Sequence, residues 1–122
     1  MPIQDFSKRT FQLWEYHVSH GLLLIRSPQG PESNVNFDLI CIGVEYMEIP
    51  RFLRGLQICE PTAKELQELE RRLGKSLAVN EIHILLSGDR RFKLVAAKIW
   101  LEENELDIFE SRLEKFGKDG SD

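Results

Sequence analysis

The stretch from residue 10 to residue 28, TFQLWEYHVSHGLLLIRSP, decides the fold of this chain. It contains two segments of large apolar and aromatic residues, separated by Ser19, His20 and Gly21. A glycine beside small or polar residues is typical of a tight turn between strands. We therefore predict two antiparallel β-strands that fold back on each other as a hairpin.

Both faces of these two strands are apolar. Because side chains alternate between the faces of a strand, the sequence places Phe11 and Leu13 on one face and Trp14 and Tyr16 on the other. The run Leu-Leu-Leu-Ile at 22–25 is apolar on both faces. Exposed apolar surface costs about 25 cal/mol per Å², so such strands need cover on both sides. A barrel or half-barrel, a second sheet or another chain are the three ways to supply it.

Five further strands are predicted, over residues 35–42, 44–49, 56–59, 81–86 and 91–101. Gly43, between the first two, indicates a bulge, a bend or a close backbone approach. Residues 51–55 are expected to form a short connection, with one helical turn as an option. The range 91–101 also fits a helical stripe, but its β-branched residues and the turn before it favour a strand.

Two amphipathic helices complete the pattern. Thr62 and Glu65 have the spacing of a capping box, and Gly74 is a typical helix end, so a helix is predicted over residues 63–73. A second helix is predicted to begin at Asn104. The apolar stripes of the two helices are Leu66, Leu69 and Leu73, and Leu106, Phe109, Leu113 and Phe116. The predicted fold class is α+β: a mainly antiparallel curved sheet or half-barrel of about six to seven strands, with both helices packed on one face.

A length of 122 residues predicts a single domain. Residues 1–9 and 117–122 are expected to be flexible tails. Cys41 and Cys59 both lie in apolar runs, which predicts free thiols in a reducing compartment. The N-terminus has no apolar core of a signal peptide, and the chain has no long apolar run. We therefore expect a cytoplasmic protein that does not span a membrane.

The net charge of −4 comes from one end of the chain. Residues 102–122 hold eight acidic and three basic side chains, while the remainder is nearly neutral. No basic stripe is present, and clustered cations are needed to bind a nucleic-acid backbone. We therefore expect no nucleic-acid partner.

Catalytic and metal-binding motifs are not found in the sequence. It has no phosphate-binding loop, dinucleotide fingerprint, zinc-protease motif or nucleophile elbow. His17 and His20 are three residues apart, an offset that points them to opposite faces of a strand, so they are interpreted as ordinary sheet and turn histidines. Ser19 and His20 are adjacent, and their side chains are expected to diverge. No catalytic residue, metal ligand or cofactor is predicted.

The remaining candidates are aromatic and basic residues of the types enriched in interface hot spots: Trp14, Tyr16, His20, Arg26, Arg51 and Arg54. They predict a non-enzymatic interaction protein that dimerises or docks on a protein partner through an apolar, aromatic sheet surface. One alternative is that the aromatic residues belong to the core and the arginines lie in solvent. Another is a small-molecule binder, or an enzyme without local motifs. Its cavity inside the curled sheet would be lined by Trp14, Tyr16 and Phe37, with arginines to clamp a carboxylate.

Overall fold

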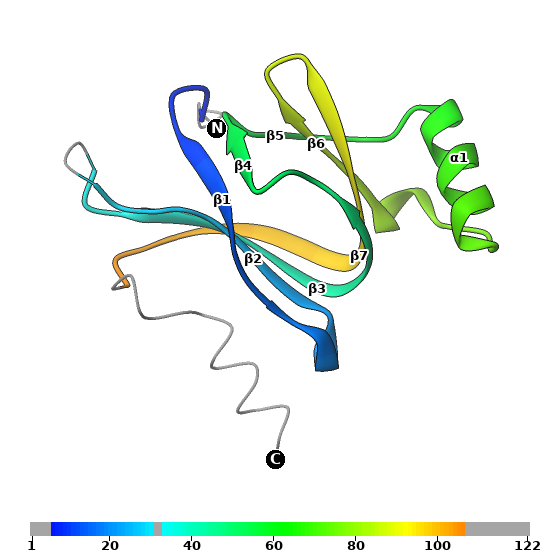
Figure 1. Cartoon of the computed structure of the whole chain (residues 1–122), viewed down its shortest axis with the longest axis horizontal. Helices are drawn as coiled ribbons and strands as arrows, with labels where there is room; N and C mark the ends of the chain where they lie inside the picture. Colours follow the sequence, from blue (N-terminus) through cyan, green and yellow to red (C-terminus); the bar gives the residue numbers. More distant parts are fainter. Residues whose placement is uncertain (1–5, 31–32, 107–122) are drawn as a thin grey trace.

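The computed structural model describes residues 6–30 and 33–106. These residues form one antiparallel sheet of seven strands, curled into a half-barrel, together with one α-helix (Figure 1). The sheet order is β4-β1-β2-β3-β7-β6-β5. The strands are β1 (Thr10–His17), β2 (Leu22–Ser27), β3 (Asn36–Glu48), β4 (Phe52–Arg54), β5 (Gln57–Cys59), β6 (Ile82–Ser87) and β7 (Arg90–Asn104). The helix is α1 (Ala63–Leu73), and two short 3₁₀ turns are η1 (Val18–His20) and η2 (Val79–Glu81).

The two edge strands of the sheet are consecutive in the chain. Only Gly55 and Leu56 separate β4 from β5, although these strands lie at opposite ends of the sheet order. At the end of β6, the Ser87 hydroxyl donates a hydrogen bond of 2.7 Å to the carbonyl oxygen of Arg54. Because so short a connection joins the two edges, the sheet has to curl. The predicted half-barrel is confirmed, and its curl covers one face of the two-faced strands.

The concave side of the sheet holds the largest core. Its buried side chains, named here the inner cluster, are Phe6, Phe11, Leu23, Ile25, Leu39, Cys41, Leu53, Leu56, Leu85, Leu94 and Ala96. Phe6 and Arg9, which were grouped with the flexible N-terminal tail, are held against the sheet in this structure. The Phe6 ring meets the Phe11 ring edge-on at 5.5 Å, and the Gly55 amide donates to the Arg9 carbonyl at 2.7 Å.

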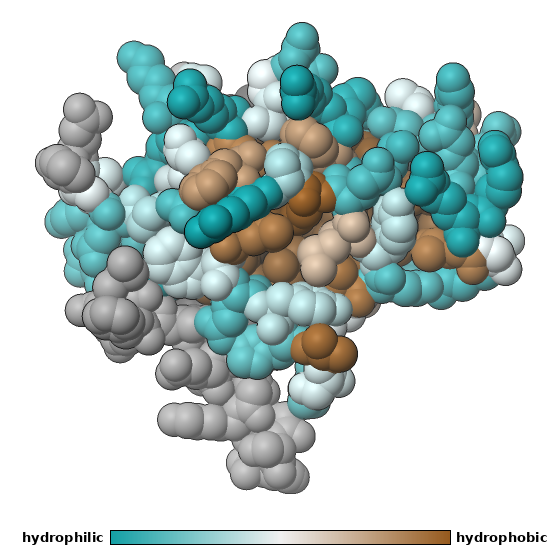
Figure 2. Space-filling model, in the orientation of Figure 1, coloured by the Kyte–Doolittle hydropathy of each residue, from teal (hydrophilic) through white to brown (hydrophobic). Residues whose placement is uncertain are grey.

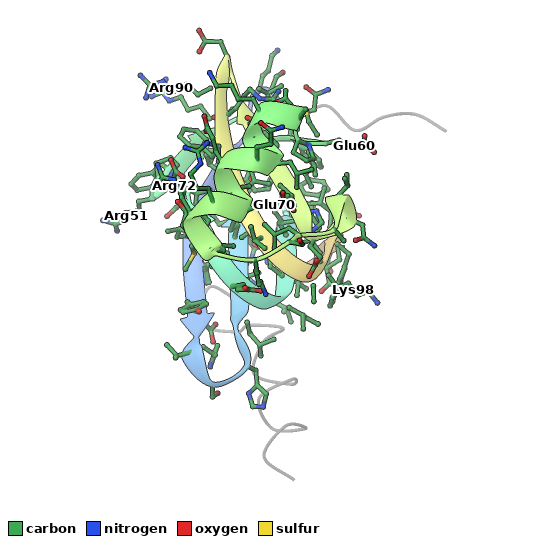
Figure 3. The ribbon with its side chains drawn as sticks, turned by 90° about the vertical axis from the view of Figure 1, so that its right-hand side faces the viewer. Arg51, Glu60, Glu70, Arg72, Arg90 and Lys98 are labelled. Carbon is green, nitrogen blue, oxygen red and sulfur yellow. The ribbon has the colours of Figure 1, made fainter. Side chains whose placement is uncertain are left out.

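Helix α1 has the predicted bounds and the predicted caps. The Glu65 amide donates to Thr62 Oγ1 at 3.1 Å, and the Thr62 amide donates to Glu65 Oε1 at 2.8 Å. Gly74 ends the helix in the left-handed conformation, with φ 68°. The leucine stripe packs on the outer side of β6 and β7, where α1 crosses the sheet (Figure 3). The buried residues of this second cluster are Leu69, Leu77, Ile82, Ile84 and Val95.

The structure describes one of the two predicted helices. Asn104 is the last residue of β7, and its Oδ1 accepts a hydrogen bond of 3.2 Å from the Leu106 amide. A hydrogen bond from the backbone amide of one residue to the side-chain oxygen two residues before it is the contact expected of a helix N-cap residue. Residues 107–116, which carry the rest of the second predicted helix, lie outside the described residues.

Seven strands are present, but their division differs from the prediction. Residues 35–42 and 44–49 belong largely to the single strand β3, which passes through Gly43 with φ 68°. A Cβ atom there would lie 3.0 Å from the Ala97 Cβ atom, and the register between β3 and β7 shifts just after it, between Val44 and Tyr46, as one of the predicted options, a bulge, requires. The helical turn considered for 51–55 is wrong, since these residues include β4, which pairs with β1. The range 91–101 lies within β7, which confirms the strand.

A β-bulge changes the faces of β1. Leu13 pairs with Ile25, but Glu15 pairs with Leu24, so Trp14 is the extra residue. Tyr16 consequently pairs with Leu23 of the inner cluster. Trp14 instead packs on a third cluster, the outer cluster, with Leu22, Leu24, Ile40, Ile42 and Trp100. The prediction that Trp14 and Tyr16 share a face is wrong, because the bulge shifts the alternation by one residue.

Candidate functional site

Arg26 is the penultimate residue of β2, next to the loop that begins at Pro28, and its side chain is buried within the sheet. Its side chain and that of Asp38 on β3 are both 0% exposed. Arg26 Nε donates to Asp38 Oδ1 at 2.8 Å, and Arg26 Nη2 donates to Asp38 Oδ2 at 3.0 Å. The indole of Trp14 lies 5.2 Å from the guanidinium carbon. These two predicted site residues therefore have their polar and aromatic contacts inside the protein.

The Asp38 carboxylate has a further partner at the end of β7. Asn104 Nδ2 donates to Asp38 Oδ2 at 2.7 Å, and Asn36 Nδ2 donates to Asn104 Oδ1 at 2.8 Å. Asn36 also donates to the carbonyl of Leu106 at 2.9 Å. The network joins three strands through a buried ion pair, and we assign it a structural role.

His20 and Tyr16 lie toward the η1 end of the first hairpin, away from β4. His20 is exposed, and its Nδ1 atom is 3.1 Å from the Ser19 hydroxyl. The expectation that these adjacent side chains diverge is wrong, because they lie in the 3₁₀ turn η1 and not on a strand. His17 contacts Glu15. Within the described residues, no three His, Cys, Asp or Glu side chains converge to hold a metal ion.

A cavity lined jointly by Trp14, Tyr16 and Phe37 is not formed. Phe37 packs against the inner cluster, while Trp14 packs on the outer cluster on the other side of the sheet. Tyr16 is 41% exposed. The three rings therefore do not line a common cavity.

Arg51 and Phe52 form an exposed cation–π pair at the start of β4. Phe52 is 51% exposed, and the Arg51 guanidinium carbon lies 5.1 Å from the centre of its ring. The Arg51 carbonyl accepts a hydrogen bond of 2.9 Å from the Leu13 amide, which holds this segment against β1. Arg51 projects from the edge of the molecule in Figure 3.

Phe52 is on the face of β4 opposite buried Leu53, and the half-buried apolar side chains nearest in the chain and on β1 face the inner cluster instead. Leu13, Met47 and Ile49 are half-buried and pack against that cluster. Figure 2 shows an apolar area at the centre of one face, framed by hydrophilic side chains. We name the exposed pair Arg51 and Phe52 the Phe52 surface.

Positive charge adjoins the Phe52 surface. Arg54, two residues beyond Phe52, is exposed and pairs with Thr10 through the backbone of β1. Among the described residues, neither Arg51 nor Arg54 forms an ion pair with a carboxylate. Two exposed guanidinium groups therefore flank an exposed aromatic ring.

A separate open hollow lies beside β1 and the end of β2, with a volume of about 530 Å³. Sequence reasoning missed it, because Lys8 and Arg9 fall in a stretch expected to be a loose tail. The described residues that line it share hydroxyl, amide or cationic groups, apart from a glycine and a proline: Lys8, Arg9, Thr10, Gln12, Ser27, Pro28, Gln29, Gly30 and Ser33.

Arg9 anchors one wall of this hollow. Its guanidinium donates to the Ser27 and Ser33 hydroxyls at 2.7 and 3.1 Å, and to the carbonyls of Ser27, Pro28 and Val35. The Phe37 ring lies 4.6 Å from the guanidinium carbon. All of these partners are neutral. Partial burial lowers the pKa of Arg9 from its ordinary value.

A scan against protein-family models, a search of curated proteins and a search of solved structures found no match to this chain. In the part that the structure describes, no helix has the length and apolar character needed to cross a membrane.

Proposed function

We propose that this protein is a non-enzymatic interaction protein that docks on a protein partner through the Phe52 surface. The observation that carries the proposal is the exposed Arg51–Phe52 stack at the edge strand β4. Aromatic and arginine side chains are the types enriched at interface hot spots.

The charge of the surface indicates the chemistry of the partner. Arg51 and Arg54 are both exposed, and within the described residues neither forms an ion pair with a carboxylate. A partner that presents one or two carboxylates beside an apolar side chain would pair with both groups and cover the Phe52 ring. Guanidinium groups bind carboxylates in a two-point geometry, which adds orientation to the contact.

The test compares substitutions at Phe52 and Arg54 with a substitution at an apolar residue of similar exposure elsewhere on the protein. Tagged wild-type protein, Phe52→Ser, Arg54→Glu and Val79→Ser are used to isolate partners from the native host, and any partner found is purified and titrated by calorimetry. Val79 is a matched control, because it is 49% exposed and lies in η2 away from β4. We expect Phe52→Ser and Arg54→Glu to weaken the affinity at least tenfold, as expected for hot-spot residues, and Val79→Ser to leave it unchanged.

Light scattering of the purified protein distinguishes a second copy of this chain from a different partner. A dimer that dissociates in Phe52→Ser would identify the partner as a second copy. Equal partner affinity for Phe52→Ser, Arg54→Glu and wild type would show that the Phe52 surface does not dock the partner.

A further inference from the structure

We infer that the open hollow beside β1 is a binding site for a small molecule bearing an oxyanion, a carboxylate or a phosphate group. The inference is argued from residues other than Arg51 and Phe52, although Gln12 of the hollow pairs with Phe52 across β1 and β4. It depends on the charge, the donors and the size of the hollow.

The charge of the lining is positive and uncompensated within the described residues. Lys8 and Arg9 both line the hollow, and none of its described lining residues is an aspartate or glutamate. Among the described residues, the hydrogen-bond acceptors of the Arg9 guanidinium are hydroxyl and carbonyl oxygens. These neutral groups fix its orientation but leave its charge in place, and an anion is the ligand that compensates it.

The hollow also offers donors for the oxygens of such a group. Arg9 Nη1 makes one described hydrogen bond, to Ser33, and each terminal guanidinium nitrogen carries two hydrogens. Thr10 contributes a hydroxyl, while Gln12 and Gln29 contribute amide groups. Charge-assisted bonds from a cation to an oxyanion are shorter and stronger than neutral ones.

The geometry of Arg9 indicates preorganisation. Its five hydrogen bonds and the Phe37 ring hold the guanidinium in one position before a ligand arrives. A side chain that is already ordered loses less conformational entropy on binding. The volume of about 530 Å³ accommodates a small metabolite, since ligand sites commonly occupy about 300–1,000 Å³.

The test is a titration of the full chain with inorganic phosphate and, separately, with citrate, followed by amide NMR. Sodium chloride at matched ionic strength is the reference. We expect saturable shifts confined to residues 8–12, 27–30 and 33. If phosphate saturates the shifts at a lower concentration than citrate, the site prefers a phosphate group. The reverse order identifies a carboxylate as the preferred group.

Three variants separate binding from folding. Lys8 is exposed, so Lys8→Glu is expected to fold normally and to weaken binding at least tenfold, the effect of losing a contact with a charged group. Arg9→Lys keeps the charge but removes the planar guanidinium and its several N–H donors. It is expected to weaken binding while the circular dichroism spectrum stays unchanged. Lys64→Glu makes the same charge change on exposed α1 and is expected to leave binding intact.

Two results would overturn the inference. The first is a set of amide chemical-shift changes that rise linearly with anion concentration at basic residues over the whole surface. Such changes indicate nonspecific ion screening. The other is a titration in which Lys8→Glu and Lys64→Glu behave alike.

Discussion

Arg26 and Asp38 face each other across β2 and β3 and form a two-point ion pair with no exposed surface on either side chain. Removal of one member leaves the other as a buried charge without its partner. We predict that Arg26→Met destabilises the fold by about 3–5 kcal/mol. Urea unfolding followed by circular dichroism measures this change.

The double variant Arg26→Met, Asp38→Leu is the control for that prediction. It removes both charges and is expected to be more stable than either single variant, because no uncompensated charge remains. If the single variant cost less than 1 kcal/mol, or if the two single effects simply added, the pair would not have the structural role assigned to it.

Gly21 connects the first hairpin to β3. Its φ is +57°, its carbonyl accepts a bond of 2.9 Å from the Val44 amide, and a Cβ atom would lie 2.8 Å from the Val44 nitrogen. Gly88 has φ +63° but open space around it. We expect Gly88→Ala to cost about 1–2 kcal/mol from backbone strain alone, and Gly21→Ala to cost distinctly more. Equal losses in thermal unfolding would contradict the close approach.

The stability contributed by Glu65 depends on pH. The hydrogen bond from Arg91 lowers the pKa of Glu65 to about 2, against about 4.3 in an unfolded chain. Because the folded pKa is the lower one, this stabilisation is complete above about pH 4.3. It is lost as the pH falls toward 2.

The variant Glu65→Gln tests that dependence. We expect it to be less stable than wild type at neutral pH, with a difference that shrinks between about pH 4 and pH 2. Glu103→Gln, at an exposed position of β7, is the matched control. A difference between Glu65→Gln and wild type that did not vary with pH would count against the role of the charge.

The two cysteines differ in accessibility. Cys41 lies in the inner cluster, where burial raises the pKa of its thiol to about 12, and Cys59 is half-buried at the end of β5. Only the thiolate reacts readily with a disulfide reagent. We expect one thiol per native chain to react with Ellman's reagent at mildly alkaline pH, and none in Cys59→Ala until the chain is unfolded. Rapid labelling of native Cys59→Ala would show that β3 opens locally.

The local parts of the fold could be predicted from the sequence. The bounds of α1 follow from Thr62, Glu65 and Gly74, because capping depends on neighbours three or four residues away. The first hairpin and the strand at 91–101 follow from alternation and turn residues. The apolar character of both strand faces predicted that both faces of the sheet need cover. The curl of the sheet covers one of them.

The parts that depend on register could not be predicted. The bulge at Trp14 carries no sequence signature, yet it moves Tyr16 to the opposite face. The pairing of Arg26 with Asp38 depends on the register between β2 and β3, which the sequence of their connection does not specify. Arg9 reads as part of a polar N-terminal stretch, and only the folded chain brings it to Ser27 and Ser33.

The central claim is that a protein partner docks on the Phe52 surface, and a photo-crosslinking amino acid at position 52 tests it most directly. The same amino acid at position 79, where exposure is nearly equal, is the reference. The account predicts a discrete adduct from position 52 that excess wild-type protein suppresses and that Arg54→Glu abolishes, with none from position 79. Adducts of the same size and yield from both positions would contradict it.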